Sequence, residues 1–497
     1  MTGQALGPTV AILFAAVMSV SAQVVTRVSE WPDGAVFQPE GPSSAISPDG
    51  RMVVLIGREL MLKTVDTGAL DRILSLPDSP QSVRFSADNR YLMFLTRDGE
   101  LPLRNFLLDV MSRQLQLIPR PAGITTTSGG MISADTRWLV YGAGGRLVLH
   151  DRIEDAITEI PGSMPLDSVF AISDDGSRVV MRRQSSPLER ASLVVFDRVT
   201  GVVERVDVGM PTLDGLSLVF GARISGDGRY VAFDALCVLT PCDDPFRRLY
   251  IRDLNWRRTS QPIRGIDGLP PQFGVDLVSI SRDGRHVLFT SGSRNLVAGV
   301  VFLNLFIVDR FTERIIQVNG GQGGSDFAAA MDGDGLRVAF AGIPIIPRGP
   351  GLTFSGYGPV FLSSVDVDGD GMQDDWERFV GLSPSDAGDG GTDDDHDGVS
   401  NLDEYRAGLQ PRARFQFRTR GEIDPERARL VLQNRNAEPA LVWLRLVDRK
   451  GLWAAHALEI PPRSTRALAF TDVPNRPREP FVLQLHADAL VYPRLSQ

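Results

Sequence analysis

One short motif recurs seven times between residues 46 and 340, and it constrains the fold more than any other feature of the sequence. An apolar residue precedes Ser-x-Asp, Gly and Arg usually follow, and two apolar residues come four and six positions after the Asp. The six complete copies begin at Ile46, Phe85, Ile132, Ile172, Ile224 and Ile280, and a shortened seventh begins at Met331. Successive motif Asp residues lie 39 to 56 residues apart. Such a period indicates a repeat architecture.

Each copy predicts a β-hairpin. Ser-x-Asp-Gly forms turns readily, because the Asp side chain can accept a backbone N–H two residues further on and Gly tolerates a positive φ. The apolar pair then faces one side of the following strand. A repeat of this length accommodates about four short strands, which is typical of one propeller blade. We therefore predict an all-β chain with a seven-bladed β-propeller over residues 35–364, and Val24–Phe37 is a candidate for the strand that closes the ring.

The sixth copy, from Ile280 to Arg310, carries the clearest family likeness. On these repeats, over about Ala35–Ser364, the chain resembles the TolB-like family of WD-type β-propellers. The resemblance implies that the repeated Ser and Asp residues form turns and do not catalyse a reaction. Because propellers serve both as interaction platforms and as enzymes, the fold does not choose between these functions.

The composition changes abruptly after the last repeat. Residues 366–404 contain 14 carboxylates and one basic residue, Arg378, which gives this segment a formal charge of −13 in a chain whose net charge is −9. A run of like charge usually belongs to a solvated tail. Here the spacing of the carboxylates indicates a metal site instead.

The acidic segment contains two complete twelve-residue loops of the EF-hand type. Such a loop offers oxygen ligands from positions 1, 3, 5, 7 and 9, a glycine at position 6, and a bidentate Glu at position 12. The predicted ligands of the first loop are Asp366, Asp368, Asp370, the carbonyl of Met372, Asp374 and Glu377. Those of the second loop are Asp393, Asp395, Asp397, the carbonyl of Val399, Asn401 and Glu404. All of these ligands are hard oxygens, so we predict Ca²⁺ as the cofactor.

The flanks of the loops differ from those of an ordinary EF-hand pair. The first loop follows a strand at Val360–Leu362, and short exit helices are predicted at Asp375–Val380 and Ser400–Arg406. Residues 365–411 resemble the bacterial calcium modules that are similar to thrombospondin type-3 and dockerin repeats. The dockerin likeness implies a cohesin-type partner as a minor alternative. We predict a module that is rigid with calcium and flexible without it.

The ends of the chain give two further predictions. The apolar run Val10–Val20, followed by Ser21 and Ala22, is typical of a signal peptide over residues 1–22, with a buried N-terminal strand as the alternative. No other segment approaches the length of a membrane span. Residues 412–497 contain short alternating strands and predict an immunoglobulin-like β-sandwich, in which Trp443 and Trp453 are expected in the core.

The two cysteines, Cys237 and Cys242, are separated by four residues that include a proline. In an exported protein this spacing favours a small local disulfide, and a two-cysteine metal site is the weaker alternative because no other Cys or His lies nearby. We therefore predict that the two cysteines are bonded.

Few residues of the chain suit acid–base or nucleophilic chemistry. There are five histidines and two lysines, and no familiar catalytic motif is present. We therefore predict a non-enzymatic, secreted or cell-surface calcium-binding protein that acts as a scaffold for a protein or polysaccharide partner, with no nucleic-acid partner. The alternatives are a periplasmic location and an extracellular polysaccharide lyase or hydrolase with its site in the propeller funnel.

Overall fold

The computed structural model describes residues 24–29 and 44–496, apart from 58, 87, 97–103, 120–128, 185, 187–190, 210–216, 238–243, 256, 299–302, 320–323, 343–344, 349–350, 355–359, 414, 420–421, 425, 449–450, 471–479 and 488–490. The predicted signal peptide lies outside the described residues, as does Cys242, so export and the disulfide stay predictions. None of the helices in the described part of the chain is long and apolar enough to cross a bilayer.

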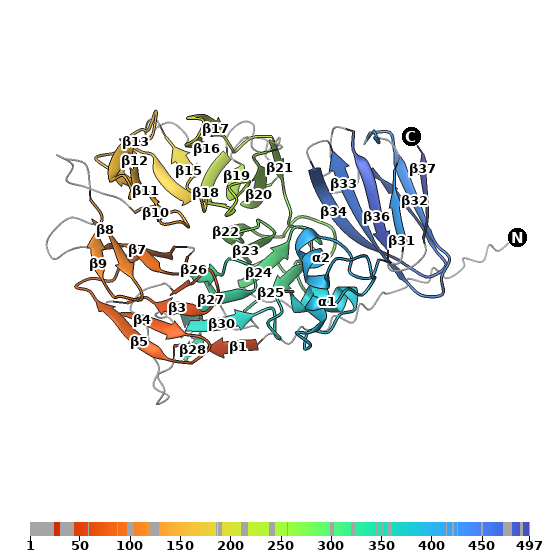
Figure 1. Ribbon diagram of the computed structural model, residues 1–497, viewed down its shortest axis with the longest axis horizontal. Coiled ribbons are helices and arrows are strands. Elements are labelled where there is room, and N and C mark those ends of the chain that lie inside the picture. Colours follow the sequence, from red (N-terminus) through yellow and green to blue (C-terminus); the bar gives the residue numbers. More distant parts are fainter. Residues whose placement is uncertain are drawn as a thin grey trace, which may run out of the picture.

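Seven four-stranded antiparallel sheets make up the described part of the chain between residues 24 and 364 (Figure 1). Six of them take their strands in chain order. The first sheet contains β2 (Ser44–Ile46), β3 (Met52–Leu55), β4 (Glu59–Thr64) and β5 (Leu70–Ser75). The second sheet contains β6 (Gln81–Phe85), β7 (Tyr91–Thr96), β8 (Arg104–Asp109) and β9 (Leu115–Leu117). The third sheet contains β10 (Met131–Ile132), β11 (Trp138–Ala143), β12 (Arg146–Asp151) and β13 (Ala156–Glu159). The fourth sheet contains β14 (Ser168–Ile172), β15 (Arg178–Arg183), β16 (Ser192–Asp197) and β17 (Val203–Arg205). The fifth sheet contains β18 (Ser217–Ile224), β19 (Tyr230–Cys237), β20 (Arg248–Asp253) and β21 (Arg258–Ser260). The sixth sheet contains β22 (Val275–Ile280), β23 (His286–Ser291), β24 (Asn304–Asp309) and β25 (Ile315–Gln317).

The seventh sheet joins the two ends of this region. Its order is β26 (Gly324–Met331), β27 (Arg337–Gly342), β30 (Val360–Ser364) and β1 (Val24–Arg27). The N-terminal strand therefore pairs with the last strand, Val24 opposite Ser364, and closes the ring as the sequence suggested. The hairpin β28 (Ile345–Arg348) and β29 (Gly351–Phe354) is inserted between β27 and β30. The chain is thus nearly all-β and its sheets lie around a centre, which is the arrangement of a β-propeller.

The repeated Ser and Asp residues form the turns that the sequence predicted. In the first copy the buried Ser47 hydroxyl donates to Asp49 at 2.5 Å and accepts the Met52 N–H at 2.9 Å. The glycine at the fourth position of the turn has a positive φ, for example 68° at Gly50, and Asn89 adopts 64° where the second copy lacks glycine. Because all of these bonds span five residues or fewer, the motif specifies each turn locally.

The two apolar motif positions supply the core between neighbouring sheets. All fourteen of these side chains are at most 1% exposed: Val53, Leu55, Leu92, Phe94, Leu139, Tyr141, Val179, Met181, Val231, Phe233, Val287, Phe289, Val338 and Phe340. One buried cluster, for example, joins Ala232 and Ile251 of the fifth sheet to Val287 and Phe306 of the sixth. Burial of such side chains contributes roughly 1.5–3 kcal/mol each.

A chain of backbone hydrogen bonds links the motif turns around the central axis. Arg282 N–H donates to the Gly333 carbonyl at 2.7 Å, and Gly333 N–H donates to Pro48 at 2.8 Å. On the other side Gly226 donates to Arg282 at 2.8 Å, and Asp174 donates to Gly226 at 2.9 Å. These bonds fix the relative positions of the inner ends of neighbouring sheets.

After the propeller come three short helices and then two more sheets. The helices are α1 (Asp374–Val380), the 3₁₀ helix η1 (Asp389–Gly391) and α2 (Asn401–Ala407). One sheet has the order β31 (Phe415–Arg418), β36 (Val482–Ala487), β33 (Ala440–Asp448) and β34 (Gly451–Ile460); the other has the order β35 (Thr465–Ala469), β32 (Arg429–Asn434) and β37 (Val491–Ser496). Both sheets contribute to one core that includes Leu430, Leu444 and Leu485. They form a two-sheet β-sandwich.

Candidate metal centre

The first acidic loop starts two residues after β30 and ends in α1. Ligand oxygens of Asp366, Asp368 and Asp370 lie within 4.8 Å of one another. The backbone folds around Asp366, whose carboxylate accepts the N–H groups of Gly369 at 2.7 Å and Gly371 at 3.0 Å. Gly371 has a φ of 98°, a conformation that favours glycine, so the glycine at loop position 6 makes the sharp turn. Three of the predicted ligands are therefore brought together.

Glu377 is the most informative residue of this loop. Its side chain is fully buried, and neither carboxylate oxygen has a hydrogen-bond partner among the described residues. Burial, followed by the charges of Asp370 and Asp368, raises the pKa of Glu377 to about 9. A buried carboxylate without a partner is costly. A cation held jointly with the neighbouring carboxylates would remove that cost.

Asp389 joins this group from outside the twelve-residue loop. A ligand oxygen of Asp389 lies within 4.8 Å of one from Asp370 and one from Glu377. The Asp389 Oδ2 accepts the Ser383 N–H at 2.8 Å, whereas Oδ1 is buried without a partner among the described residues. The sequence analysis missed this residue because a turn outside the twelve-residue loop, which the loop pattern does not include, brings it to the site. The only sequence signal was its membership of the acidic run.

The second loop brings its three aspartates together as the first loop does, with more exposure, but Glu404 is outside this carboxylate group. Ligand oxygens of Asp393, Asp395 and Asp397 lie within 4.8 Å of one another, and the Asp393 carboxylate accepts the Gly398 N–H at 2.9 Å. Glu404 is 1% exposed, and its Oε2 has no partner among the described residues. Burial, followed by Asp395 and its acidic neighbours, raises the pKa of Glu404 to about 9.

The residues at loop position 9 have other partners. Asp374 accepts the Val367 N–H at 2.8 Å and an Arg378 N–H at 3.0 Å. Asn401 donates to the Asp389 carbonyl at 2.9 Å and to Thr392 Oγ1 at 3.0 Å. Asp374 is outside the carboxylate groups described above, and both side chains brace the backbone. Because position 9 often ligates through water, their role as ligands stays a prediction, as does that of the Met372 and Val399 carbonyls.

The donor set fits a hard divalent cation. Six buried oxygens that lack hydrogen-bond partners among the described residues belong to carboxylates of the two loops or of Asp389: Asp368 Oδ2, Asp370 Oδ2, Glu377 Oε1 and Oε2, Asp389 Oδ1 and Glu404 Oε2. Sites made of oxygen ligands alone suit Ca²⁺, Mg²⁺ or Mn²⁺. Twelve-residue loops with several carboxylates favour Ca²⁺, which accepts more ligands and a less regular geometry than Mg²⁺.

The acidic module, residues 365–411, packs against the propeller through α2. Arg285 of the sixth sheet is 1% exposed, makes two hydrogen bonds to Asp309 at 3.1 and 2.8 Å, and also donates to the Tyr405 carbonyl. The Tyr405 ring lies under this guanidinium, 3.8 Å from its central carbon, and its hydroxyl is 3.2 Å from His286 Nε2. Tyr405 follows Glu404 directly, so the second loop is attached to the propeller core.

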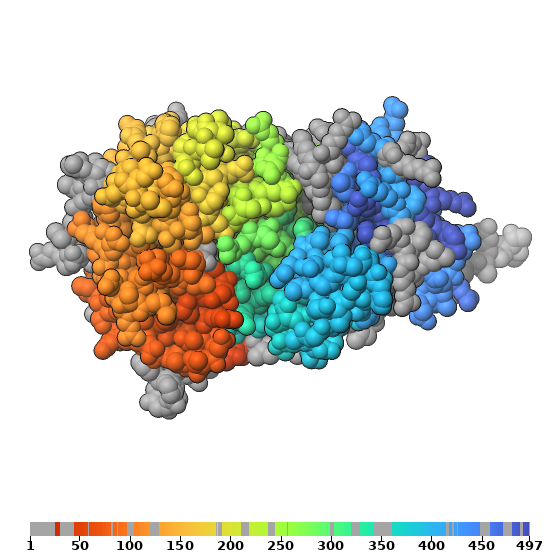
Figure 2. Space-filling view, viewed as in Figure 1, coloured from red at the N-terminus to blue at the C-terminus, as the bar shows by residue number. Residues whose placement is uncertain are grey.

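The module also packs against the sandwich. Met372, Trp376 and Tyr405 share a buried cluster with Leu441 and Trp443 of β33. In Figure 2 the module, coloured cyan, fills the space between the propeller and the blue sandwich. Trp443 is therefore a core residue, as expected, although it belongs to the boundary with the module. The side chain of Trp453 lies outside the described residues.

Comparison with known proteins gives only distant likenesses. No protein-family model and no curated protein sequence matches the chain. An oligogalacturonate lyase from Vibrio parahaemolyticus is 12% identical, with a TM-score of 0.48 over 69% of this chain and 93% of that chain. TolB from Acinetobacter baumannii is 13% identical, with a TM-score of 0.36 over 63% of this chain and 76% of that chain. At these values the likenesses lend no weight to a function, and the propeller assignment rests on the sheet topology.

Proposed function

We propose that this chain is a secreted, non-enzymatic calcium-binding protein in which two Ca²⁺ ions make residues 365–411 a rigid joint between a seven-bladed propeller and an immunoglobulin-like sandwich. The observation that carries the proposal is the fully buried Glu377, whose two carboxylate oxygens lack partners beside the carboxylates of Asp370 and Asp389. The module makes buried contacts with both neighbouring domains, so ordering it fixes their relative orientation.

The two rigid domains would then present a constant surface to a protein or polysaccharide partner outside the cell, with the periplasm as the alternative location. Neither a nucleic-acid partner nor a membrane span is part of this proposal. The alternative of a polysaccharide lyase or hydrolase in the funnel stays a prediction.

Limited proteolysis tests the joint. Removal of calcium with EGTA should make the chain sensitive to protease near residues 386–392, where Asp386, Ala387 and Gly388 are exposed. Without metal, the −13 charge of the acidic segment repels itself, and the loops lose the cation that holds their carboxylates together. The propeller and the sandwich have their own cores, so both should survive as intact fragments. The measurement is mass spectrometry of the fragments with and without calcium.

Magnesium provides the matched control, because it adds the same charge but demands a regular octahedral site. We expect calcium to protect the joint at concentrations where magnesium does not. Cleavage at the same rate with and without calcium, or loss of the propeller fragment upon chelation, would contradict the rigid joint.

A further inference from the structure

The propeller encloses a central cavity of about 600 Å³. All seven inner strands, β2, β6, β10, β14, β18, β22 and β26, contribute to its lining. Cavities of roughly 300–1,000 Å³ are the usual size for small-molecule sites. The cavity lies apart from the acidic module, because none of its described lining residues falls within 365–411.

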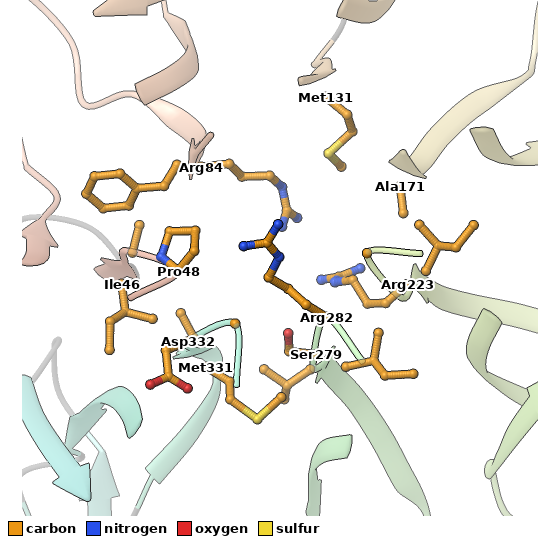
Figure 3. A pocket seen from close by; sticks show the side chains of 18 of the residues that line it. Ile46, Pro48, Arg84, Met131, Ala171, Arg223, Ser279, Arg282, Met331 and Asp332 are labelled. Carbon is orange, nitrogen blue, oxygen red and sulfur yellow. The ribbon is translucent and has the colours of Figure 1, made fainter. Parts of the chain in front are cut away.

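Three guanidinium groups meet at the centre of this cavity (Figure 3). Arg84 comes from β6, Arg223 comes from β18, and Arg282 comes from the turn between β22 and β23. Each of these side chains extends from a different sheet, and they point toward one another in the close view. Sequence analysis could not find this group, because the three residues come from separate repeats.

Two of the three guanidinium groups, those of Arg84 and Arg223, have few hydrogen-bond acceptors from the described residues. The Nε of Arg84 is buried and has no hydrogen-bond partner among the described residues, and Arg223 donates to the carbonyl of its neighbour Ala222 at 2.9 Å. Burial lowers the pKa of both residues, and the charge of Arg84 lowers that of Arg223 further. This is the direction expected for partly buried cations that face each other across a cavity.

The nearby carboxylates are engaged elsewhere. Asp174 pairs with Arg282 at 2.7 Å, and Asp332 accepts the N–H groups of Gly335 and Leu336 at 2.9 Å each. Asp234, which favours the charged form of Arg223, forms an ion pair with Arg247 at 3.3 Å through Oδ2, and its Oδ1 has no hydrogen-bond partner among the described residues. The charge of Arg84 and Arg223 therefore has no dedicated partner in the described lining.

Apart from the charged residues, most side chains of the lining are apolar. Phe85, Ile132, Phe170 and Met331 contribute to the wall. Guanidinium groups match the planar geometry of carboxylate and phosphate groups and form charge-assisted hydrogen bonds with them. A ligand that complements both the guanidinium groups and the apolar side chains of the cavity therefore combines an oxyanion with an apolar body.

We propose that the central cavity binds a small organic oxyanion, whose carboxylate or phosphate group lies between Arg84 and Arg223 and whose body contacts the apolar wall. The ion pair between Arg282 and Asp174 lies beside this site, and Asp174 offsets the positive charge that Arg282 would otherwise add to it. This cavity site is independent of the acidic module and would give the propeller a ligand of its own. Carboxylate and phosphate ligands both present an oxyanion, and a separate probe for each class distinguishes between them.

Calorimetric titration of the full-length protein tests this site with two probes that each combine an oxyanion with an apolar body, benzoate and phenyl phosphate, in low-salt buffer without added calcium. We expect one equivalent of at least one probe to bind. Arg84→Gln and Arg223→Gln should each weaken that binding at least about tenfold, since each removes a charge-assisted hydrogen bond. Arg72→Gln is the matched control, because Arg72 is an exposed residue of the outer strand β5, pairs with Glu59 of β4 and is not among the described lining residues.

Thermal unfolding separates a binding role from a structural one. Two cations that repel each other across the cavity destabilise the free protein. Arg84→Met should therefore raise the melting temperature in buffer without the probes, while it abolishes the added stabilisation that the bound probe gives the wild type. The proposal would be overturned if neither probe bound at 10 mM, roughly the weak end of specific binding, if binding survived in both glutamine variants, or if Arg84→Met lowered the melting temperature.

Discussion

Glu377 and Glu404 occupy equivalent positions in the two loops, yet their environments differ. Both oxygens of Glu377 lack partners among the described residues, whereas only Oε2 of Glu404 does. The first site also includes Asp389, an additional carboxylate that has no counterpart in the described surroundings of the second site. The first site therefore has the greater excess of buried negative charge, and we expect it to bind calcium more tightly.

Replacement of Asp389 tests its assignment to the first site. Asp389→Asn should weaken calcium binding at one of the two sites at least about tenfold, because it removes a charged ligand. It should weaken the other site less, through the hydrogen bond from Asn401 to the Asp389 carbonyl. Calorimetric calcium titration of the full chain measures both affinities.

Asp386→Asn is the matched control for this experiment. Asp386 is exposed, lies three residues from Asp389 and undergoes the same change of charge. We expect it to weaken binding only slightly and only at low ionic strength. Equal effects of the two substitutions would show that Asp389 acts through its general charge and is not a ligand.

At the scale of elements, the attachment of α2 to the propeller depends on the buried pair Arg285–Asp309. Burial acts to raise the pKa of Asp309, but the charge and hydrogen bonds of Arg285 outweigh it and hold that pKa well below its ordinary value. Asp309→Asn should lower the free energy of unfolding by about 3–5 kcal/mol, because it leaves the Arg285 charge buried without its partner. Urea unfolding, followed by the fluorescence of the buried tryptophans Trp376 and Trp443, measures this loss.

The exposed pair Arg72–Glu59 offers the comparison. Glu59→Gln should cost at most about 1 kcal/mol, since exposed ion pairs are largely screened by solvent. If Asp309→Asn cost no more than Glu59→Gln, the buried pair would not hold α2 in place.

His286 gives the same interface a pH dependence. Its ring lies between Tyr405 and the Asp334 carbonyl, and burial lowers its pKa, while Asp309 and Asp283 oppose this shift and Arg285 adds to it. Below about pH 6.5, its ordinary value, the unfolded chain binds a proton that the folded chain does not, so stability falls as the pH falls. Unfolding of the wild type and of His286→Gln between pH 7.5 and about 5 isolates this contribution.

We expect the wild type to lose stability relative to His286→Gln as the pH falls through this range. A histidine that is exposed, His396, supplies the control: His396→Gln should follow the wild-type profile when calcium is saturating. Parallel profiles for wild type and His286→Gln would show that His286 does not resist protonation in the folded protein.

For the molecule as a whole, the sequence predicted the features whose contacts are local. Each motif turn closes within five residues, as at Ser47 and Asp49, and each acidic loop folds its backbone around its own first Asp. Contacts between distant segments were not predictable from these patterns. Asp389 reaches the first site through a turn outside the loop, Arg285 meets Tyr405 across two domains, and Arg84 meets Arg223 across the cavity. A single sequence carries no signal for such pairs.

The count of bound calcium ions tests the central proposal most directly. Calorimetric titration of the full-length protein should find two Ca²⁺ per chain, with dissociation constants on the order of 10⁻⁴ to 10⁻³ M if the sites resemble extracellular modules. Glu377→Gln and Glu404→Gln should each leave one ion, because each removes a charged, bidentate ligand from one loop while side-chain size stays almost the same. The double variant should bind none. Absence of binding to the wild type at millimolar calcium, or two ions retained by the double variant, would contradict the assignment of both loops.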